Sequence, residues 1–296
     1  MAKNLLTQPH LTNELAAQDF LIKMRWPEGI TCVHCQGEKV YTLNVRGSKR
    51  RVLKCGNGKC RKQFSPTVGT IFEGSHIPLT KWFMTIHLMC SSKKGISAHQ
   101  LHRMLGVTYK TAWFMAHRIR HAMTQLTGTT PLSGIVEADE TYVGGKRIGP
   151  GMGVRDHKVP VFALVERGGE VRSMVMPRVT ANTLRAAIRT NVKPTTHVMT
   201  DGANVYTNVS SDVASHETVN HHEKEYVRGI VHTNTIEGYF SLLKRGINGT
   251  YHHVAEKHLH RYLAEFDFRY NARKADDSIR TLAAIRGIEG KRLQYR

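Results

Sequence analysis

Four cysteines near the N-terminus have a spacing that could bind a metal. They form a C-x2-C pair, Cys32 and Cys35, and a C-x4-C pair, Cys55 and Cys60, with 19 residues between the pairs. Two short thiolate pairs at this separation are typical of a tetrahedral structural zinc site. Disulfides are the alternative, but nothing in the sequence indicates an oxidising compartment. We therefore expect these four thiolates to bind one Zn²⁺ within a zinc ribbon.

Carboxylates in the second half of the chain suggest a different chemistry. Asp139 lies in a run, 133–143, that alternates like a strand, and Asp201 follows a short apolar strand predicted at 197–200. If these strands are neighbours in one sheet, the two carboxylates approach each other. Oxygen ligands of this kind suit Mg²⁺ or Mn²⁺, and two-metal sites hold two such ions about 3.5–4 Å apart. The alternative is that Asp201-Gly202 only forms a turn.

A capped helix predicted over 233–246 supplies further polar groups. Glu237, Ser241 and Lys244 share one face of this helix at i, i+4 and i+7, opposite an apolar stripe. Glu237 can therefore complete a metal site with Asp139 and Asp201, while Lys244 meets a phosphate. Three acids on three elements indicate metal-dependent phosphodiester chemistry more strongly than any one of them alone.

The charge of the chain points to a polyanionic partner. The sequence has 296 residues with 43 Lys and Arg against 23 Asp and Glu, a formal net charge of +20. Hydrophobic residues make up 40%, enough for buried cores, so a disordered basic tail protein is excluded. No apolar run reaches the roughly 18 residues that a membrane-spanning helix needs. Nucleic acid is the simplest partner for such a surface.

The positive charge is concentrated in one segment. Residues 74–136 contain no Asp or Glu, and within them a helix at 96–105, a Gly-containing turn and a helix at 109–120 predict a helix-turn-helix. The alternative is an ordinary helical hairpin. The acid-free composition favours DNA docking. The expected DNA-binding residues, including two from the late helix, are Tyr109, Lys110, Arg118, Arg120, Lys244 and Arg245.

The order of predicted elements indicates an α+β chain with several parts. After residue 133 the order is strand, hairpin, helix, strand, strand and helix, which resembles the ribonuclease-H-like fold with its mixed sheet. The expected parts are an N-terminal helical lead (1–25), the zinc ribbon (26–72), the helix-turn-helix-like DNA-binding segment (77–126), the catalytic domain (133–275) and a C-terminal basic tail (276–296).

Several motifs together resemble a known family. The segments Ala138-Asp-Glu-Thr-Tyr-Val-Gly-Gly-Lys146, Thr200-Asp-Gly202, His232-Thr-Asn-Thr-Ile-Glu-Gly238 and Phe266-Asp-Phe-Arg-Tyr-Asn271 are similar to those of Merlin-related bacterial insertion-sequence transposases with an ISXO-type transposase domain. The four-cysteine region is similar to that family's N-terminal zinc-binding region. The resemblance implies a DDE-type transposase that cuts DNA at the ends of an insertion sequence and joins them to target DNA.

The resemblance also implies roles for particular residues. Asp139 and Asp201 match the first two metal-binding acids, and Lys244 matches a lysine seven residues after the third. Some branches of the family use Asn at the third place, so Asn234 is an alternative to Glu237, which we favour because a carboxylate binds Mg²⁺ better than a neutral amide. The implied partners are double-stranded DNA, as terminal inverted repeats and target, and further copies of the chain on that DNA. The implied location is the bacterial cytoplasm, at the nucleoid.

Two other functions remain as alternatives. A transcription regulator would use the zinc ribbon and helix-turn-helix and would give the three acids no reason to converge. A ribonuclease-H-like nuclease would cut DNA without joining it. A covalent mechanism through Tyr142 or Ser241 is disfavoured, because neither has a convincing base and arginine nearby in the sequence pattern.

Overall fold

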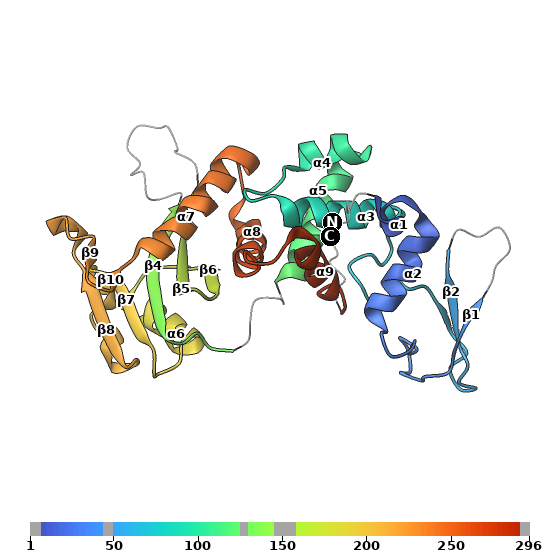
Figure 1. Ribbon diagram of the computed structural model, residues 1–296, viewed down its shortest axis with the longest axis horizontal. Helices are drawn as coiled ribbons and strands as arrows, with labels where there is room; N and C mark the ends of the chain where they lie inside the picture. The colour runs from blue at the N-terminus through green and yellow to red at the C-terminus, as the bar shows by residue number, and fades with distance from the viewer. Residues whose placement is uncertain (1–6, 44–49, 125–129, 145–157, 291–296) are drawn as a thin grey trace. The chain divides into compact units, whose positions relative to one another are not determined.

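The computed structural model describes residues 7–43, 50–124, 130–144 and 158–290, and it divides the chain into two compact units (Figure 1). The first unit contains residues 1–126 and 275–296, and the second contains residues 127–274. The division falls between the predicted helix-turn-helix segment and the predicted catalytic domain.

Within the described ranges, no helix is both long and apolar enough to cross a membrane. Gly145 and Lys146, the end of the first family motif, lie outside the described residues.

Four helices form the centre of the first unit. They are α1 (Pro9–Thr12), α2 (Glu14–Arg25), α3 (Leu79–Ser91) and α9 (Asp277–Arg286). The core side chains Leu21, Trp82 and Phe83 are fully buried, and Ile285 of α9 is 1% exposed. Helix α9 packs on α3, and Arg280 donates to the carbonyl of Cys90 at 2.6 Å. The expectation of a basic tail at 276–296 is therefore corrected. Residues 277–286 form a helix whose apolar side chains Ala284 and Ile285 are buried.

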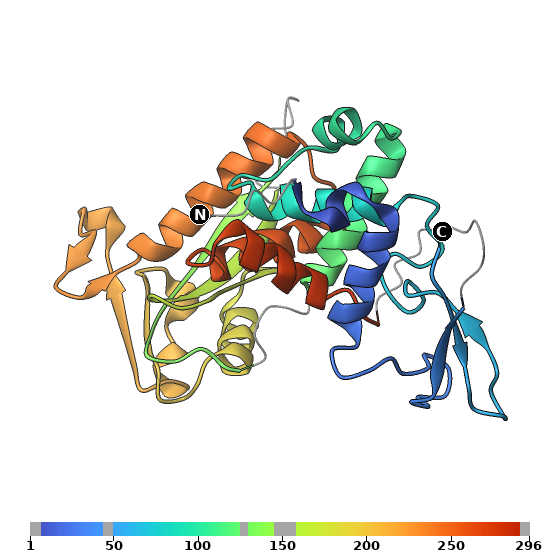
Figure 2. The ribbon, with the colours of Figure 1, turned by 45° about the vertical axis from the view of Figure 1, so that its right-hand side comes forward.

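The zinc ribbon is a small antiparallel sheet. Its strands are β1 (Val40–Leu43), β2 (Val52–Cys55) and β3 (Gln63–Phe64), in that order across the sheet. Leu53 and Phe64 are buried together with two of the cysteines. Figure 2 shows this slender sheet beside α2, and Arg51 donates to both carboxylate oxygens of Asp19 in that helix at 2.8 Å.

The predicted helix-turn-helix is present as α4 (Ala98–Leu105) and α5 (Tyr109–Met123). The Ser97 hydroxyl accepts from the N–H of Gln100, and the Thr108 hydroxyl accepts from the N–H of Thr111, so each helix begins at a side-chain cap. Gly106 has φ +59° between them, a conformation in which glycine avoids the steric cost of a Cβ. Local sequence therefore fixes both helix starts and the turn.

The second unit is built on a five-stranded mixed sheet. In sequence the strands are β4 (Ile135–Val143), β5 (Val159–Glu166), β6 (Val171–Val175), β7 (His197–Asp201) and β8 (Ser215–Val219). Their spatial order is β6-β5-β4-β7-β8. The first three are antiparallel neighbours, whereas β7 is parallel to β4 and β8 is parallel to β7. This mixed sheet is consistent with a ribonuclease-H-like domain and confirms the α+β fold class.

Helices cover both faces of this sheet. Ile236 and Leu243 of α7 (Asn234–Gly246) are buried with Val161 on one face, where α8 (Glu256–Asn271) also packs. On the other face, Leu184 of α6 (Ala181–Asn191) is buried with Phe162. The remaining elements are the hairpin of β9 (Val227–Arg228) and β10 (Val231–His232), three short 3-10 helices at Asn204–Tyr206, Val209–Ser211 and His221–Glu223, and a π-helical turn at Ile247–Tyr251.

Helix α8 satisfies the free edge of β6. The Asn271 side chain accepts from the N–H of Val171 at 2.7 Å and donates to the carbonyl of the same residue at 3.1 Å. One turn earlier, Asp267 accepts from the N–H and the hydroxyl of Ser173. An edge strand exposes unpaired backbone groups, and these two side chains pair with them in place of another strand. The family motif at 266–271 thus includes two residues that hold the sheet edge.

Candidate active site

The sheet register brings two of the predicted acids to the same level. β4 and β7 are parallel, with Ile135 opposite His197 and Glu137 opposite Met199. When the same register is extended by two residues along both strands, Asp139 lies opposite Asp201 at the end of β7. The prediction that these two strands are neighbours in one sheet is confirmed.

The charge of Asp139 interacts with those of Asp201 and Glu237. Burial is the largest cause that raises the pKa of the Asp139 carboxyl, and repulsion by Glu140, Asp201 and Glu237 adds to it. The N–H of Glu140 donates to Asp139 Oδ1 at 2.7 Å and opposes the shift. The resulting pKa is about 7. A carboxyl in this state readily exchanges its proton for a cation near neutral pH.

One open hollow contains two of the three predicted acids and the two predicted cations of α7, while Asp201 is not among its lining residues. It has a volume of about 400 Å³ and includes Asp139 of β4 together with Glu237 and Lys244 of α7. The other lining residues are Glu140, Thr141, Phe240, Ser241 and Arg245. Asn234 is exposed at the first position of α7 and is not part of this lining. Glu237 shares this hollow with Asp139, and Asn234 does not; the assignment of Glu237 as the third acid stays a prediction.

The donor set of this hollow fits a hard divalent cation. Carboxylate oxygens are the ligands that Mg²⁺ and Mn²⁺ prefer. Across the described ranges, only the four cysteines form a group of three or more candidate ligands with all donor atoms within 4.8 Å of one another. Asp139, Asp201 and Glu237 are spaced more widely than that. A residue at the start of the same helix also holds Glu237, because the Thr233 hydroxyl donates to Glu237 Oε1 at 3.0 Å.

The four cysteines form a compact zinc-binding group. The Sγ atoms of Cys32 and Cys60 are 3.9 Å apart, and those of Cys35 and Cys55 are 3.6 Å apart. Four sulfurs about 2.3 Å from one tetrahedral zinc are separated by roughly 3.8 Å, so these distances fit. Burial opposes ionisation of Cys32, but the N–H groups of His34 and Cys35 and adjacent thiols lower its pKa to about 7. The spacing-based prediction of a structural zinc site is supported.

Sequence reasoning assigned no role to Glu137, which is among the most fully paired side chains of the second unit. Its side chain is completely buried, and its carboxylate accepts from the N–H groups of Thr235 and Ile236 at 2.8 and 2.9 Å. Arg167 Nε donates to it at 2.7 Å. The available sequence signal was an acid two residues before Asp139 on the same strand face.

A fourth acid, Glu140, is also close to the site and was not predicted. It interacts with the charge of Asp201, and its carboxylate accepts a hydrogen bond from the hydroxyl of Tyr206. Burial and the nearby charge of Glu140 raise the pKa of Tyr206, which keeps this hydroxyl a neutral donor. Glu140 thus adds negative charge beside Asp139 while Tyr206 holds it in place.

The helix-turn-helix exposes only part of the predicted DNA-binding set. Tyr109 is 45% exposed, its ring lies 4.3 Å from that of His99, and Lys110 is exposed beside it. Arg118 and Arg120, in contrast, are 7% and 2% exposed. Arg118 donates to the carbonyls of Ile71 and Glu73, so it holds the chain that precedes α3. The predicted placement of these two arginines on a DNA-facing surface is therefore wrong, because both are buried in the fold.

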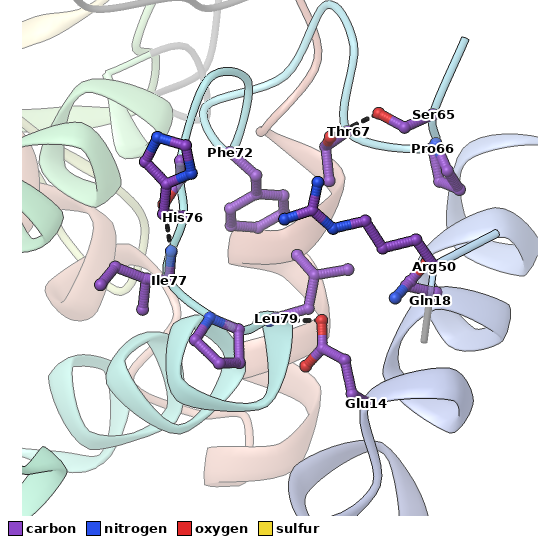
Figure 3. A pocket seen from close by; sticks show the side chains of 12 residues that line it. Glu14, Gln18, Arg50, Ser65, Pro66, Thr67, Phe72, His76, Ile77 and Leu79 are labelled. Atoms are coloured by element: carbon purple, nitrogen blue, oxygen red, sulfur yellow. Dashed lines mark hydrogen bonds between the residues drawn. The ribbon is translucent and has the colours of Figure 1, made fainter. Parts of the chain in front are cut away.

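A second hollow lies in the first unit, and the carboxylate that lines it has a structural role. It has a volume of about 220 Å³ and lies between α2, the segment 65–78 and the start of α3. Figure 3 shows the Glu14 carboxylate pointing to the start of α3, where it accepts from the N–H groups of Leu79 and Thr80 at 3.0 and 3.3 Å. Pro78 precedes this helix and offers no side-chain cap, so Glu14 supplies one from α2.

Comparison with known proteins identifies the family. Residues 131–271 match the ISXO2-like transposase domain, and residues 12–63 match the transposase zinc-ribbon domain. An uncharacterized protein in transposable element ISH50 of Halobacterium salinarum is 31% identical over 275 residues, which cover 87% of this chain and 90% of that protein.

Among solved structures, a chain of the simian T-cell lymphotropic virus intasome in complex with PP2A regulatory subunit B56 gamma is similar at 14% identity and a TM-score of 0.30. That match covers 63% of this chain and 65% of the other. The two domain matches and the extended similarity to the ISH50 protein confirm the resemblance of the motifs: the chain belongs to the ISXO2-like family of insertion-sequence transposases.

Proposed function

We propose that this transposase is a DDE-type enzyme that cleaves the ends of an insertion sequence and joins them to target DNA. The observation that carries the proposal is that Asp139 shares a hollow with Glu237 and Lys244 while β7, the strand that ends at Asp201, pairs with β4 beside it. Asp139, Asp201 and Glu237 would hold Mg²⁺ or Mn²⁺. When bound, such ions activate a water or a 3′-hydroxyl for attack on phosphorus and stabilise the leaving oxygen.

The residues around the acids have separate tasks in this proposal. Lys244 and Arg245 lie in the same hollow as Asp139 and attract the phosphates that flank the scissile bond. Glu237 and Lys244 project from one helix, two turns apart, so the position of one fixes the position of the other. Because a water or a 3′-hydroxyl is the nucleophile in this chemistry, neither Tyr142 nor Ser241 needs to form a covalent protein–DNA intermediate.

DNA is held by the first unit as well as by the hollow. We place the DNA contact of the helix-turn-helix at the exposed start of α5, with Tyr109 and Lys110, and on the exposed residues His99 and Arg103 of α4. Residues near the start of the second helix of this motif are the ones that reach base edges in known complexes. The zinc ribbon supports this unit structurally, and the active form is a homo-oligomer on terminal inverted repeats and target DNA.

A cleavage and joining assay with repeat-end DNA and Mg²⁺ tests the proposal. Asp139→Asn and Asp201→Asn should each lower both reactions by at least about 10²-fold, because each removes a metal-ligand charge. Glu217→Gln is a matched control, since Glu217 is an exposed acid on the neighbouring strand β8. Cleavage without any joined product would favour the nuclease alternative. DNA binding without either reaction in the unaltered protein would favour the transcription regulator.

A further inference from the structure

Helix α7 begins without a cap from its own N-cap residue. Thr233 occupies that position, and its side chain makes no capping hydrogen bond to the helix. Its hydroxyl instead donates to Glu237 Oε1. The first N–H groups of any helix have no partner inside the helix, so another group must satisfy them. This other group is Glu137, which comes from the sheet.

Glu137 binds the start of α7 through both carboxylate oxygens. Oε2 accepts from the N–H groups of Thr235 and Ile236 at 2.8 and 2.9 Å, and Oε1 accepts from the Thr235 hydroxyl at 2.8 Å. The side chain is completely buried, and a negative charge at a helix N-terminus is favoured by the helix dipole. Nearly 100 residues separate the partners in sequence, so this cap is a tertiary contact.

Arg167 completes the anchor. Its Nε donates to Glu137 Oε1 at 2.7 Å. Its two remaining nitrogens donate to the carbonyls of Ile230 and His232, at 2.7 and 2.9 Å. These carbonyls belong to the chain that leads directly into α7. Arg167 therefore balances the buried charge of Glu137 and also fixes the approach to the helix.

The anchor joins the elements that carry the acids. Glu137 lies two residues before Asp139 on β4 and faces the same side of the sheet, and the N–H groups that it binds precede Glu237 by one and two residues. Because a displaced helix start would move Glu237 relative to Asp139, these contacts set the separation of the two acids.

We propose that Glu137, held by Arg167, is a positioning residue that sets the distance of Glu237 from Asp139 and thereby the affinity of the divalent-metal site. This inference rests on the proposed function for its metal-binding consequence. The anchor itself is independent of that function. The Glu137 side chain is completely buried, so we assign it a positioning role and no contact with DNA or the reacting atoms.

The test uses the full-length zinc-loaded protein and Mn²⁺ as the probe. In Glu137→Gln an amide NH₂ replaces one acceptor oxygen and the negative charge is lost. At the Oε1 position the NH₂ loses the hydrogen bond from Arg167 Nε, and at the Oε2 position it loses those from the N–H groups of Thr235 and Ile236. We expect Mn²⁺ affinity to fall about 10-fold or more, as for other groups that orient metal ligands, with unaltered DNA affinity. The amides of Thr235 and Ile236 should exchange with solvent faster.

Glu265→Gln is the matched control. Glu265 is also a completely buried glutamate that pairs with an arginine, Arg269, but it lies on α8 and accepts from Tyr251. This variant should lower stability by a similar amount and leave both Mn²⁺ affinity and exchange at the start of α7 unchanged. Equal effects of the two variants on Mn²⁺ affinity would overturn the positioning role.

A double variant separates positioning from charge balance. Glu137→Met with Arg167→Met removes the buried charge of Glu137 together with its partly exposed partner, so neither remains unpaired. We expect this folded protein still to bind Mn²⁺ weakly. Wild-type affinity in the double variant would overturn the inference.

The proposed function can fail separately from this inference. If Mn²⁺ binding by the unaltered protein does not depend on Asp139, the proposed metal site is contradicted. The exchange of the Thr235 and Ile236 amides still decides whether Glu137 anchors α7, and equal rates in wild type and in the Glu137→Met, Arg167→Met double variant, which has no acceptor oxygen at position 137, would overturn that anchor.

Discussion

The two candidate metal sites of this chain are assembled in opposite ways. The four thiols come from two short knuckles, and their donor atoms all lie within 4.8 Å of one another. The three acids come from β4, β7 and α7, and they are spaced more widely. The thiols are neighbours because of local turns. The acids are neighbours because a parallel strand pair and a helix start meet, so their separation depends on tertiary contacts such as that of Glu137.

This difference predicts different responses to damage. A zinc site contributes directly to the folding of its domain, since the ligands must come together for the metal to bind. The acid site costs the fold some stability, because burial and like charges oppose the ionisation of Asp139. Removing a zinc ligand should therefore impair structure, and removing an acid should impair chemistry while the fold remains.

The largest effect is expected from loss of zinc. Apparent binding free energies of structural zinc sites are about 10–16 kcal/mol, more than Leu53 and Phe64, the fully buried ribbon side chains that are not zinc ligands, can supply. Chelation or Cys55→Ser should unfold residues 26–64 and weaken DNA binding by the first unit. Elemental analysis and hydrogen exchange would measure this. Protein prepared without chelators that contains no zinc yet has a protected ribbon would contradict it.

Replacement of the third acid should abolish chemistry and spare the fold. Glu237→Gln removes one charge from the site, and we expect cleavage and joining to fall by about 10³-fold at unchanged DNA affinity. Asn234→Ala is the comparison, because Asn234 is exposed outside the hollow. It should cost less than about 10-fold. A dead Asn234 variant beside an active Glu237 variant would assign the third position to the asparagine.

The positions of these acids show how far the sequence could lead. The cysteine spacing predicted the zinc site because the ligands are local. The order of strands predicted that Asp139 and Asp201 would be neighbours, since mixed α+β sheets have few possible topologies. Glu137 could not be assigned, because its partners are about 100 residues away and an acid in a strand gives no sign of capping a distant helix.

In the helix-turn-helix, the sequence predicted the local structure but not which side chains are exposed. Its helices and turn follow from local caps and Gly106, and they were predicted. The burial of Arg118 and Arg120 was not, because the absence of acids in residues 74–136 indicated where cations are but not which of them face solvent. Arg118 finds its acceptors at Ile71 and Glu73, which belong to a different part of the sequence.

The stability of the metal-free protein should depend on pH through Asp139. Its pKa is about 7 in the folded chain and about 3.9 when unfolded, so the folded state binds more protons and stability falls as pH rises between these values. Asp139→Asn removes this loss. The free energy of unfolding of the variant should rise relative to that of wild type by about 1–3 kcal/mol as the pH increases from 5 to 8. Urea unfolding without divalent metal measures this, and a pH-independent difference would contradict it.

A smaller effect is expected at the start of α5. Lys110→Ala should lower the slope of log affinity against log salt by about 0.9, the value for one phosphate contact. Arg118→Ala should lower stability and leave that slope unchanged, because Arg118 is buried. Binding titrations of repeat-end DNA across salt concentrations would check both. A slope change with Arg118 but not with Lys110 would place the DNA surface elsewhere.

The proposed function requires that Asp139, Asp201 and Glu237 hold divalent metal in one site. Anomalous diffraction at the manganese edge, from crystals of the full chain grown with Mn²⁺, tests it most directly. We predict a peak within about 2.2 Å of carboxylate oxygens of Asp139 and Asp201, with Glu237 completing the site. Manganese bound elsewhere, or no peak between Asp139 and Asp201 in crystals whose cysteine site holds zinc, would contradict the account.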